Sequence, residues 1–171
     1  MFQAFDKLSS GRGLSRPDWM ALLARAPLPL LESALRPLQS ERRTEWLRRP
    51  ETGLYMVQGR TGGTGERFNL GEVTVTRCAL RSVKEDASQA PVGVAYVLGR
   101  QHRQAELAAL ADALLQGGAH QEELVSGLLV PISQYLAAQK AEKQAQVQST
   151  KVNFFTVARE AGDGADEEEA E

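Results

Sequence analysis

Residues 54–83, LYMVQGRTGGTGERFNLGEVTVTRCALRSV, contain two runs that alternate with a period of two around a glycine-rich segment. The runs 54–60 and 72–83 are rich in β-branched and aromatic residues, which favour strands. On the second run, one face is expected to carry Thr74, Thr76, Cys78 and Leu80, and the other Val73, Val75 and Ala79. A third run, residues 92–100, follows a short polar connection. Three successive strands with short connections predict an antiparallel meander.

Helical patterns precede the strands. In SRPDWMALLARA, Ser15 as cap and Pro17 at an early position predict the start of a helix that buries Trp19. LPLLESALRPLQS predicts a second short helix that ends near Pro37. SERRTEWLRR predicts a third helix, residues 40–49, that is capped by Ser40 and stops before Pro50.

Further helices follow the strands. After Gln101, leucines at helical spacing predict a helix that Gly117 and Gly118 terminate. Another helix begins near His120, is interrupted at Pro131, and is polar on almost all sides beyond Leu136. A helix of that kind is marginal unless something outside it holds it.

Composition predicts one globular domain of the α+β class. The chain has 171 residues, 42% hydrophobic and 25% charged. Aromatic residues, which contribute strongly to core packing, make up only 6%. We therefore expect a small antiparallel sheet of three or more strands, flanked by N-terminal and C-terminal helices, whose core a partner subunit completes.

Charge and cysteine content narrow the class of protein. The net charge of −2 gives no reason to expect a nucleic-acid partner. A single cysteine excludes an internal disulfide and favours a reducing compartment. The sequence shows no membrane-spanning run and no secretory signal pattern. A soluble cytoplasmic protein is expected, with residues 1–14 a flexible lead-in, 15–160 the single domain, and 161–171 a disordered acidic tail.

The glycine-rich segment, residues 59–72, does not match either common nucleotide-binding motif. A Walker loop requires a lysine and a following helix, and the segment has neither. The dinucleotide motif G-x-G-x-x-G fails because Phe68 stands where the third glycine belongs. Successive glycines can still expose backbone N–H groups that bind an anion.

An anion site is therefore one interpretation of this segment. Arginine suits phosphate and phosphonate oxygens, and the candidate substrate-binding residues are Arg60, Gly62, Gly63, Gly65 and Arg77. Further arginines lie nearby in the sequence or on the predicted strands: Arg67, Arg81 and Arg100. The alternative, which short patterns of this kind more often reflect, is a long hairpin whose arginines are solvated or paired with Glu51, Glu66 or Glu72.

No self-contained catalytic site is recognisable. His102 and His120 are the only histidines, and lone histidines are more often surface or capping residues than ligands. Together with one cysteine they do not form a zinc site, so no metal is expected. Cys78 lacks a base nearby in sequence, which favours a buried apolar role. The catalytic residues remain unassigned.

A family resemblance rests on longer stretches. Residues 48–81, RRPETGLYMVQGRTGGTGERFNLGEVTVTRCALR, and 95–116, AYVLGRQHRQAELAALADALLQ, closely resemble the PhnG family. RPDWMALLARA (16–26) and KVNFFTVARE (151–160) are similar to its terminal segments. Members are small subunits of the bacterial carbon–phosphorus lyase core complex, which degrades phosphonates.

The resemblance implies a function in an assembly. Family members act with PhnH, PhnI and PhnL to attach methylphosphonate to the ribose C1 of ATP, with Mg, and release adenine. They pack intimately against PhnI in a complex that also contains PhnH and PhnJ. We therefore expect an accessory subunit, not catalytic alone, that binds no cofactor itself.

Two alternatives stay open at this stage. One is a stand-alone phosphate- or phosphonate-binding module that uses the glycine-rich segment. The other is a complete small enzyme, which the shortage of histidines and paired acids makes the weakest reading.

Overall fold

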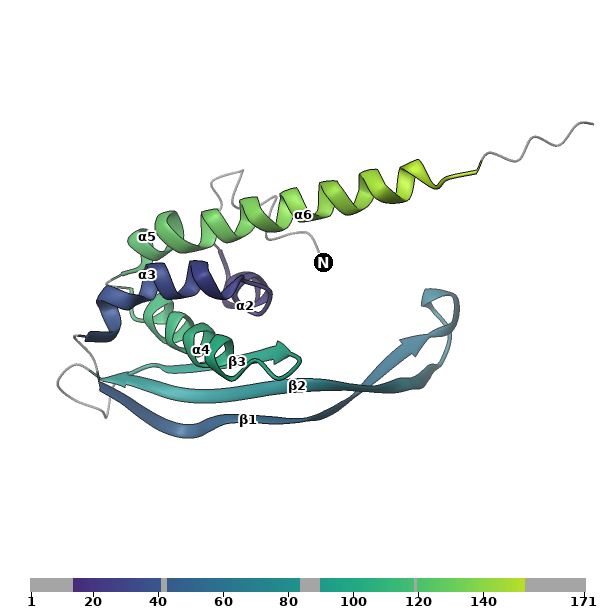
Figure 1. The fold of residues 1–171 in the computed structure, drawn as a ribbon. Helices are drawn as coiled ribbons and strands as arrows, with labels where there is room; N and C mark the ends of the chain where they lie inside the picture. The colour runs from purple at the N-terminus through teal and green to yellow at the C-terminus, as the bar shows by residue number, and fades with distance from the viewer. Residues whose placement is uncertain (1–13, 41–42, 84–89, 119, 153–171) are drawn as a thin grey trace, which may run out of the picture.

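The computed structural model describes residues 14–40, 43–83, 90–118 and 120–152. The predicted lead-in up to residue 13, the acidic tail, nearly all of the segment 151–160 and most of the polar connection after the second strand lie outside these residues. Within them, the chain forms one sheet with all its helices on one side, which confirms the predicted α+β class (Figure 1).

The sheet is the predicted antiparallel meander, in the order β1-β2-β3. Its strands are β1 (Arg43–Arg60), β2 (Arg67–Val83) and β3 (Val92–Leu98). The first two are much longer than the third, so their far ends form a two-stranded arm that projects beyond β3 and α4 (Figure 1). We call residues 53–75 the hairpin arm.

The helices form layers above the sheet. α4 (His102–Gln116) lies directly on β2 and β3, and α2 (Arg16–Leu23) and α3 (Leu28–Ser40) pack on its other side (Figure 1). α4 is thus buried on almost every side along residues 107–115, which are alanines and leucines apart from Asp112. Gly93 permits its close approach to β3, because a Cβ there would come within 1.8 Å of the Ala109 carbonyl oxygen.

The predicted alternation in β2 is confirmed. Thr76, Cys78 and Leu80 face the helices and are buried, while Val73, Val75 and Ala79 lie on the opposite face and are only partly buried. No helix of the described residues covers that opposite face (Figure 1). We call it the open face of the sheet.

The predicted third helix is wrong: residues 43–50 form the start of β1. Arg43 pairs with Val83 at the far end of β2, and Trp46 packs against the core on the helical side. Pro50 is tolerated because β1 is an edge strand and its register shifts between Arg48 and Glu51.

The second helix also differs from its prediction, because α3 continues through Pro37 to Ser40. A proline inside a helix costs about 3 kcal/mol. Leu31, Leu35 and Leu38 lie on one stripe and are all buried in the core. Burial of this stripe, including Leu38 beyond the proline, holds the last turn in place.

The final helical segment matches its prediction in outline. α5 (Gln121–Leu124) leads into the π-helical turn η2 (Val125–Leu129), and Pro131 stands in the first turn of α6 (Val130–Ser149). The irregular turn lies just before the proline. Proline lacks the backbone N–H that a regular helix would use, which accounts for the break in the regular hydrogen bonding. Beyond Leu136, α6 is exposed throughout, and none of the helices in the described ranges is long and apolar enough to cross a membrane.

A buried carboxylate joins α2, α4 and β3. Asp112 is fully buried and accepts hydrogen bonds from Arg16 Nε at 3.1 Å and Nη2 at 2.7 Å. It also accepts hydrogen bonds from Trp19 Nε1 at 2.9 Å and from the Val94 backbone N–H at 3.0 Å. Hydrogen bonding to this carboxylate raises the pKa of Arg16 above its usual value, so the guanidinium stays protonated.

Removing this carboxylate is expected to destabilise the fold strongly. Asp112→Ala leaves the indole N–H of Trp19 and the N–H of Val94 without their acceptor, and each buried donor left unsatisfied costs about 1–3 kcal/mol. Urea unfolding followed by circular dichroism measures the loss. The control is Glu32→Ala, which removes an exposed pair with Arg103 at 3.7 Å and should cost about 1 kcal/mol or less. Equal losses for the two variants would contradict the role given to Asp112.

Candidate functional site: the hairpin arm and the open face

The tip of the hairpin arm contains most of the predicted anion site. The strands extend to Arg60 and resume at Arg67, so only residues 61–66 form the connection. Gly62 and Gly63 have φ values of 58° and 82°, which favour glycine. The N–H of Gly65 donates to the Thr61 carbonyl at 2.9 Å. The glycines thus shape a turn that leads into β2, which confirms the prediction that a strand follows this segment.

Two arginines face each other at this tip. Arg60 and Arg67 are direct cross-strand neighbours and both are exposed. Arg60 Nη1 donates to the Gly65 carbonyl at 3.1 Å, and no ion pair joins Arg67 to another residue in the part of the chain that the structure describes. Like charges directly opposite one another are unfavourable. An anion bound between them would relieve this repulsion.

Arg77 lies far from that tip. Its register partner is Glu51, and ten positions of β2 separate it from Arg67, about 30 Å at about 3.3 Å per residue. The structure therefore brings Arg60, Gly62, Gly63 and Gly65 together and leaves Arg77 at the base of the arm.

Arg77 has an acidic partner, as the alternative reading of the arginines supposed. Its Nε lies 2.6 Å from Glu51 Oε1, which Arg48 also contacts. Hydrogen bonds from Arg48 and Arg77 lower the pKa of Glu51, so this cluster stays ionised at neutral pH.

A hydroxyl cluster at the base of the arm was not foreseen. Buried Thr76 donates to the Gly99 carbonyl at 2.6 Å and accepts the Gln101 N–H at 3.0 Å. Thr52 lies 3.1 Å from Thr76 Oγ1 and 2.8 Å from His102 Nε2. His102, at the start of α4, thus helps join β1 to the helix. The only sequence signal was the pair of threonines on strands.

The described residues do not form a recognisable catalytic set. His120 contacts Glu123 at 3.4 Å, and no group of three or more His, Cys, Asp or Glu in the described ranges is placed to hold a metal ion. Cys78 is buried, as predicted, and burial raises its pKa to about 12. A thiol with that pKa is protonated at neutral pH and is a poor nucleophile.

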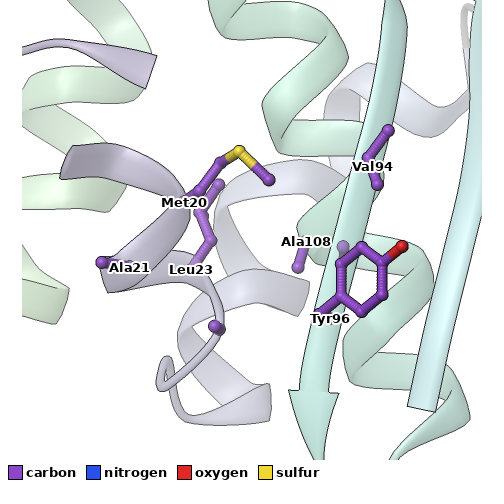
Figure 2. Close-up of a pocket in the computed structure, with 8 residues that line it drawn as sticks. Met20, Ala21, Leu23, Val94, Tyr96 and Ala108 are labelled. Carbon is purple, nitrogen blue, oxygen red and sulfur yellow. The ribbon is translucent and has the colours of Figure 1, made fainter. Parts of the chain in front are cut away.

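Two hollows border the base of the arm. The first, about 380 Å³, is centred on Gly53, and we call it the Gly53 hollow. It is lined by Glu51, Thr52, Gly53, Leu54, Tyr55, Val75, Arg77 and Tyr96. The second, about 220 Å³, lies between α2 and β3, with Met20 and Leu23 on one side and Val94 and Tyr96 on the other (Figure 2). Its lining is almost entirely apolar, and it lacks the convergent polar groups that orient a substrate.

Comparison with known proteins shows which family has this architecture. The family model described as "Phosphonate metabolism protein PhnG" matches residues 14–160. The chain belongs to the PhnG family. It is also 39% identical, over 154 residues, to the Rhizobium meliloti (strain 1021) protein named "Alpha-D-ribose 1-methylphosphonate 5-triphosphate synthase subunit PhnG". That alignment covers 90% of this chain and 95% of the relative.

Membership in the PhnG family confirms the resemblance drawn from the sequence, and it places the chain in phosphonate metabolism. The match includes all the helices and strands described above, together with the hairpin arm. The arm and the open face are therefore part of this PhnG domain.

The thiol of Cys78 is expected to be unreactive in the folded chain. Because burial raises its pKa to about 12 and its side chain faces the core, a disulfide reagent at pH 8 should modify it only after unfolding. Absorbance of the released thiolate measures this, with the same sample in denaturant as the control that shows one reactive thiol. Rapid modification of the native chain would contradict the assignment.

Proposed function

We propose that this chain is a non-catalytic subunit of an α-D-ribose 1-methylphosphonate 5-triphosphate synthase. The supporting observation is the identity of 39%, over nearly the full length of both chains, with a relative named as that subunit. In this proposal the chain works in the cytoplasm with PhnH-, PhnI- and PhnL-like proteins. The complex transfers methylphosphonate to the ribose C1 of ATP and releases adenine, within an assembly that also contains a PhnJ-like subunit.

The chemistry of that reaction supports an accessory role. Displacement of adenine requires an acid that protonates the purine and groups that stabilise positive charge on the sugar. The described residues present no such set of acids, whereas they do present guanidinium groups that can bind a triphosphate. We therefore assign acid–base chemistry to a partner and an anion contact to this chain.

The anion contact is proposed at the tip of the hairpin arm. Arg60, Gly62, Gly63 and Gly65 lie together there, and Arg67 adds a second guanidinium opposite the first. Arg77 lies about 30 Å from the tip along β2 and cannot contact an anion bound there. It would contact substrate only if a second chain held the substrate at the base of the arm.

The reconstituted mixture tests the subunit role. Purified chain is combined with its predicted partners, ATP, Mg and methylphosphonate, and adenine release is followed by chromatography. We expect no adenine from the chain alone and loss of release when the chain is omitted. Full activity without the chain would refute the proposal. Tight binding of ATP by the lone chain in calorimetry would instead support the stand-alone anion-binding module.

Substitutions at the tip test the anion contact. Arg60→Ala combined with Arg67→Ala should raise the KM for ATP about 10- to 100-fold, because a hydrogen bond to a charged group contributes about 1.5–3 kcal/mol. Arg36→Ala, at an exposed arginine on α3, is the matched control and should leave the KM unchanged. An unaltered KM in the double variant would assign the tip to assembly instead.

A further inference from the structure

The hairpin arm leaves the body of the protein at a pair of threonines. Thr52 and Thr76 are cross-strand partners that lie immediately outside the arm, and they share the face of the sheet that carries the helices. None of the side-chain hydrogen bonds among the described residues joins residues 53–75 to a helix. The contact between Thr52 and His102, the first residue of α4, is therefore the closest connection of this kind to the arm.

The direction of the hydrogen bonds in this cluster follows from a count of the protons. A carbonyl oxygen only accepts, so the single hydroxyl proton of Thr76 is donated to the Gly99 carbonyl at 2.6 Å. Thr76 then has only lone pairs left, and one of them accepts the Gln101 N–H at 3.0 Å. In the 3.1 Å contact between the two threonines, Thr52 must therefore be the donor.

The same count determines which ring nitrogen of His102 carries a proton. The only hydroxyl proton of Thr52 is already donated to Thr76, so Thr52 can only accept in its 2.8 Å contact with Nε2 of the ring. Nε2 must therefore be protonated. A neutral imidazole carries one proton, so Nδ1 keeps its lone pair, and the side chain of His102 is exposed.

We infer that His102 is a positioning residue that fastens the base of the hairpin arm to α4, as the first donor of a chain of hydrogen bonds that ends at the Gly99 carbonyl. Nε2 carries a proton in the neutral and in the protonated imidazole alike, so the fastening does not depend on the charge of the ring. Protons are gained and lost at Nδ1, which has no hydrogen-bond partner among the described residues. The benefit of this fastening to an anion contact at the tip rests on the proposed function.

The charged groups of the neighbouring elements do not pair with the ring. Arg103 lies 3.1 Å from Glu106 and 3.7 Å from Glu32, and Glu51 pairs with Arg77 beside the two threonines. None of the ion pairs in the part of the chain that the structure describes includes His102. The charged groups nearest to it along the chain or across the strands are Arg48, Glu51, Arg77, Arg100, Arg103 and Glu106.

Nitrogen-15 NMR of the histidine rings tests the direction of the chain of hydrogen bonds. At a pH where the ring is neutral, His102 should show a protonated Nε2 and a lone pair on Nδ1. His120, the only other histidine, lies outside the cluster, and His102→Gln assigns the two sets of signals. A neutral His102 with its proton on Nδ1 would overturn the inference, because Nε2 would then accept from Thr52 and acid would break the contact.

Hydrogen exchange of the backbone amides beside Thr52 tests the fastening. Thr52→Val keeps the shape of the side chain and removes the acceptor, so exchange there should accelerate about two- to tenfold, as expected for one net hydrogen bond. His102→Leu should have the same effect, whereas His102→Gln should exchange nearly as the natural chain does, because its amide N–H can replace Nε2–H. Thr64→Val, at an exposed threonine of the tip, is the matched control and should not change exchange beside Thr52.

The outcomes separate this inference from the proposed function. Unchanged exchange in Thr52→Val, or a glutamine variant that exchanges as fast as the leucine variant, would contradict the role given to His102. Circular dichroism checks that each variant is folded. Both measurements use the full chain alone, so failure of the reconstituted mixture would refute the subunit role and leave the fastening of the arm as it stands.

Discussion

The carboxylate of Asp112 fixes the relation between helices and sheet in this protein. A fully buried charge is tolerated only when its hydrogen bonds are satisfied, and here α2 supplies the side chains of Arg16 and Trp19 while β3 supplies the N–H of Val94. This one carboxylate on α4 is therefore hydrogen-bonded to both α2 and the edge strand β3, and it fixes their positions relative to one another. Since α4 lies between the sheet and the other helices, their position relative to the sheet also depends on this contact.

That arrangement places all the described helices on one face and leaves the other face and the arm uncovered (Figure 1). Much of the core consists of alanines and leucines of α4 packed against small residues of β3, such as Gly93 and Ala95. The larger side chains of β3, Tyr96 and Leu98, instead point to the open face. The core is thus built largely from small side chains and leucines, and several of the large apolar side chains remain exposed.

The sequence was most informative where local periodicity and burial agree. The alternation in β2 predicted its buried face, and the leucines of α4 predicted a helix with the correct end at Gly117. The helix predicted over residues 43–49 was wrong because the strand there depends on pairing with the end of β2. That partner lies about 35 residues away in the sequence, outside any local window. The candidate site was only partly predictable: spacing in sequence grouped Arg77 with the tip, whereas the unexpected length of both strands separates them. The family resemblance rested on long blocks of residues, not on any site geometry.

The length of the arm bears on the proposed anion contact. A two-stranded ribbon without a covered face is marginally stable in water, and at its tip the Arg60 guanidinium is held by one hydrogen bond, to the Gly65 carbonyl. A partner subunit that packs on the arm would clamp it. Clamping reduces the conformational freedom lost when an anion binds at the tip, and a pre-organised site binds more tightly than a mobile one. Assembly and anion binding would then be linked, with each increasing the affinity of the other. In the function proposed above, the chain would contribute to catalysis in this way, by supplying a positioned charge to the complete complex.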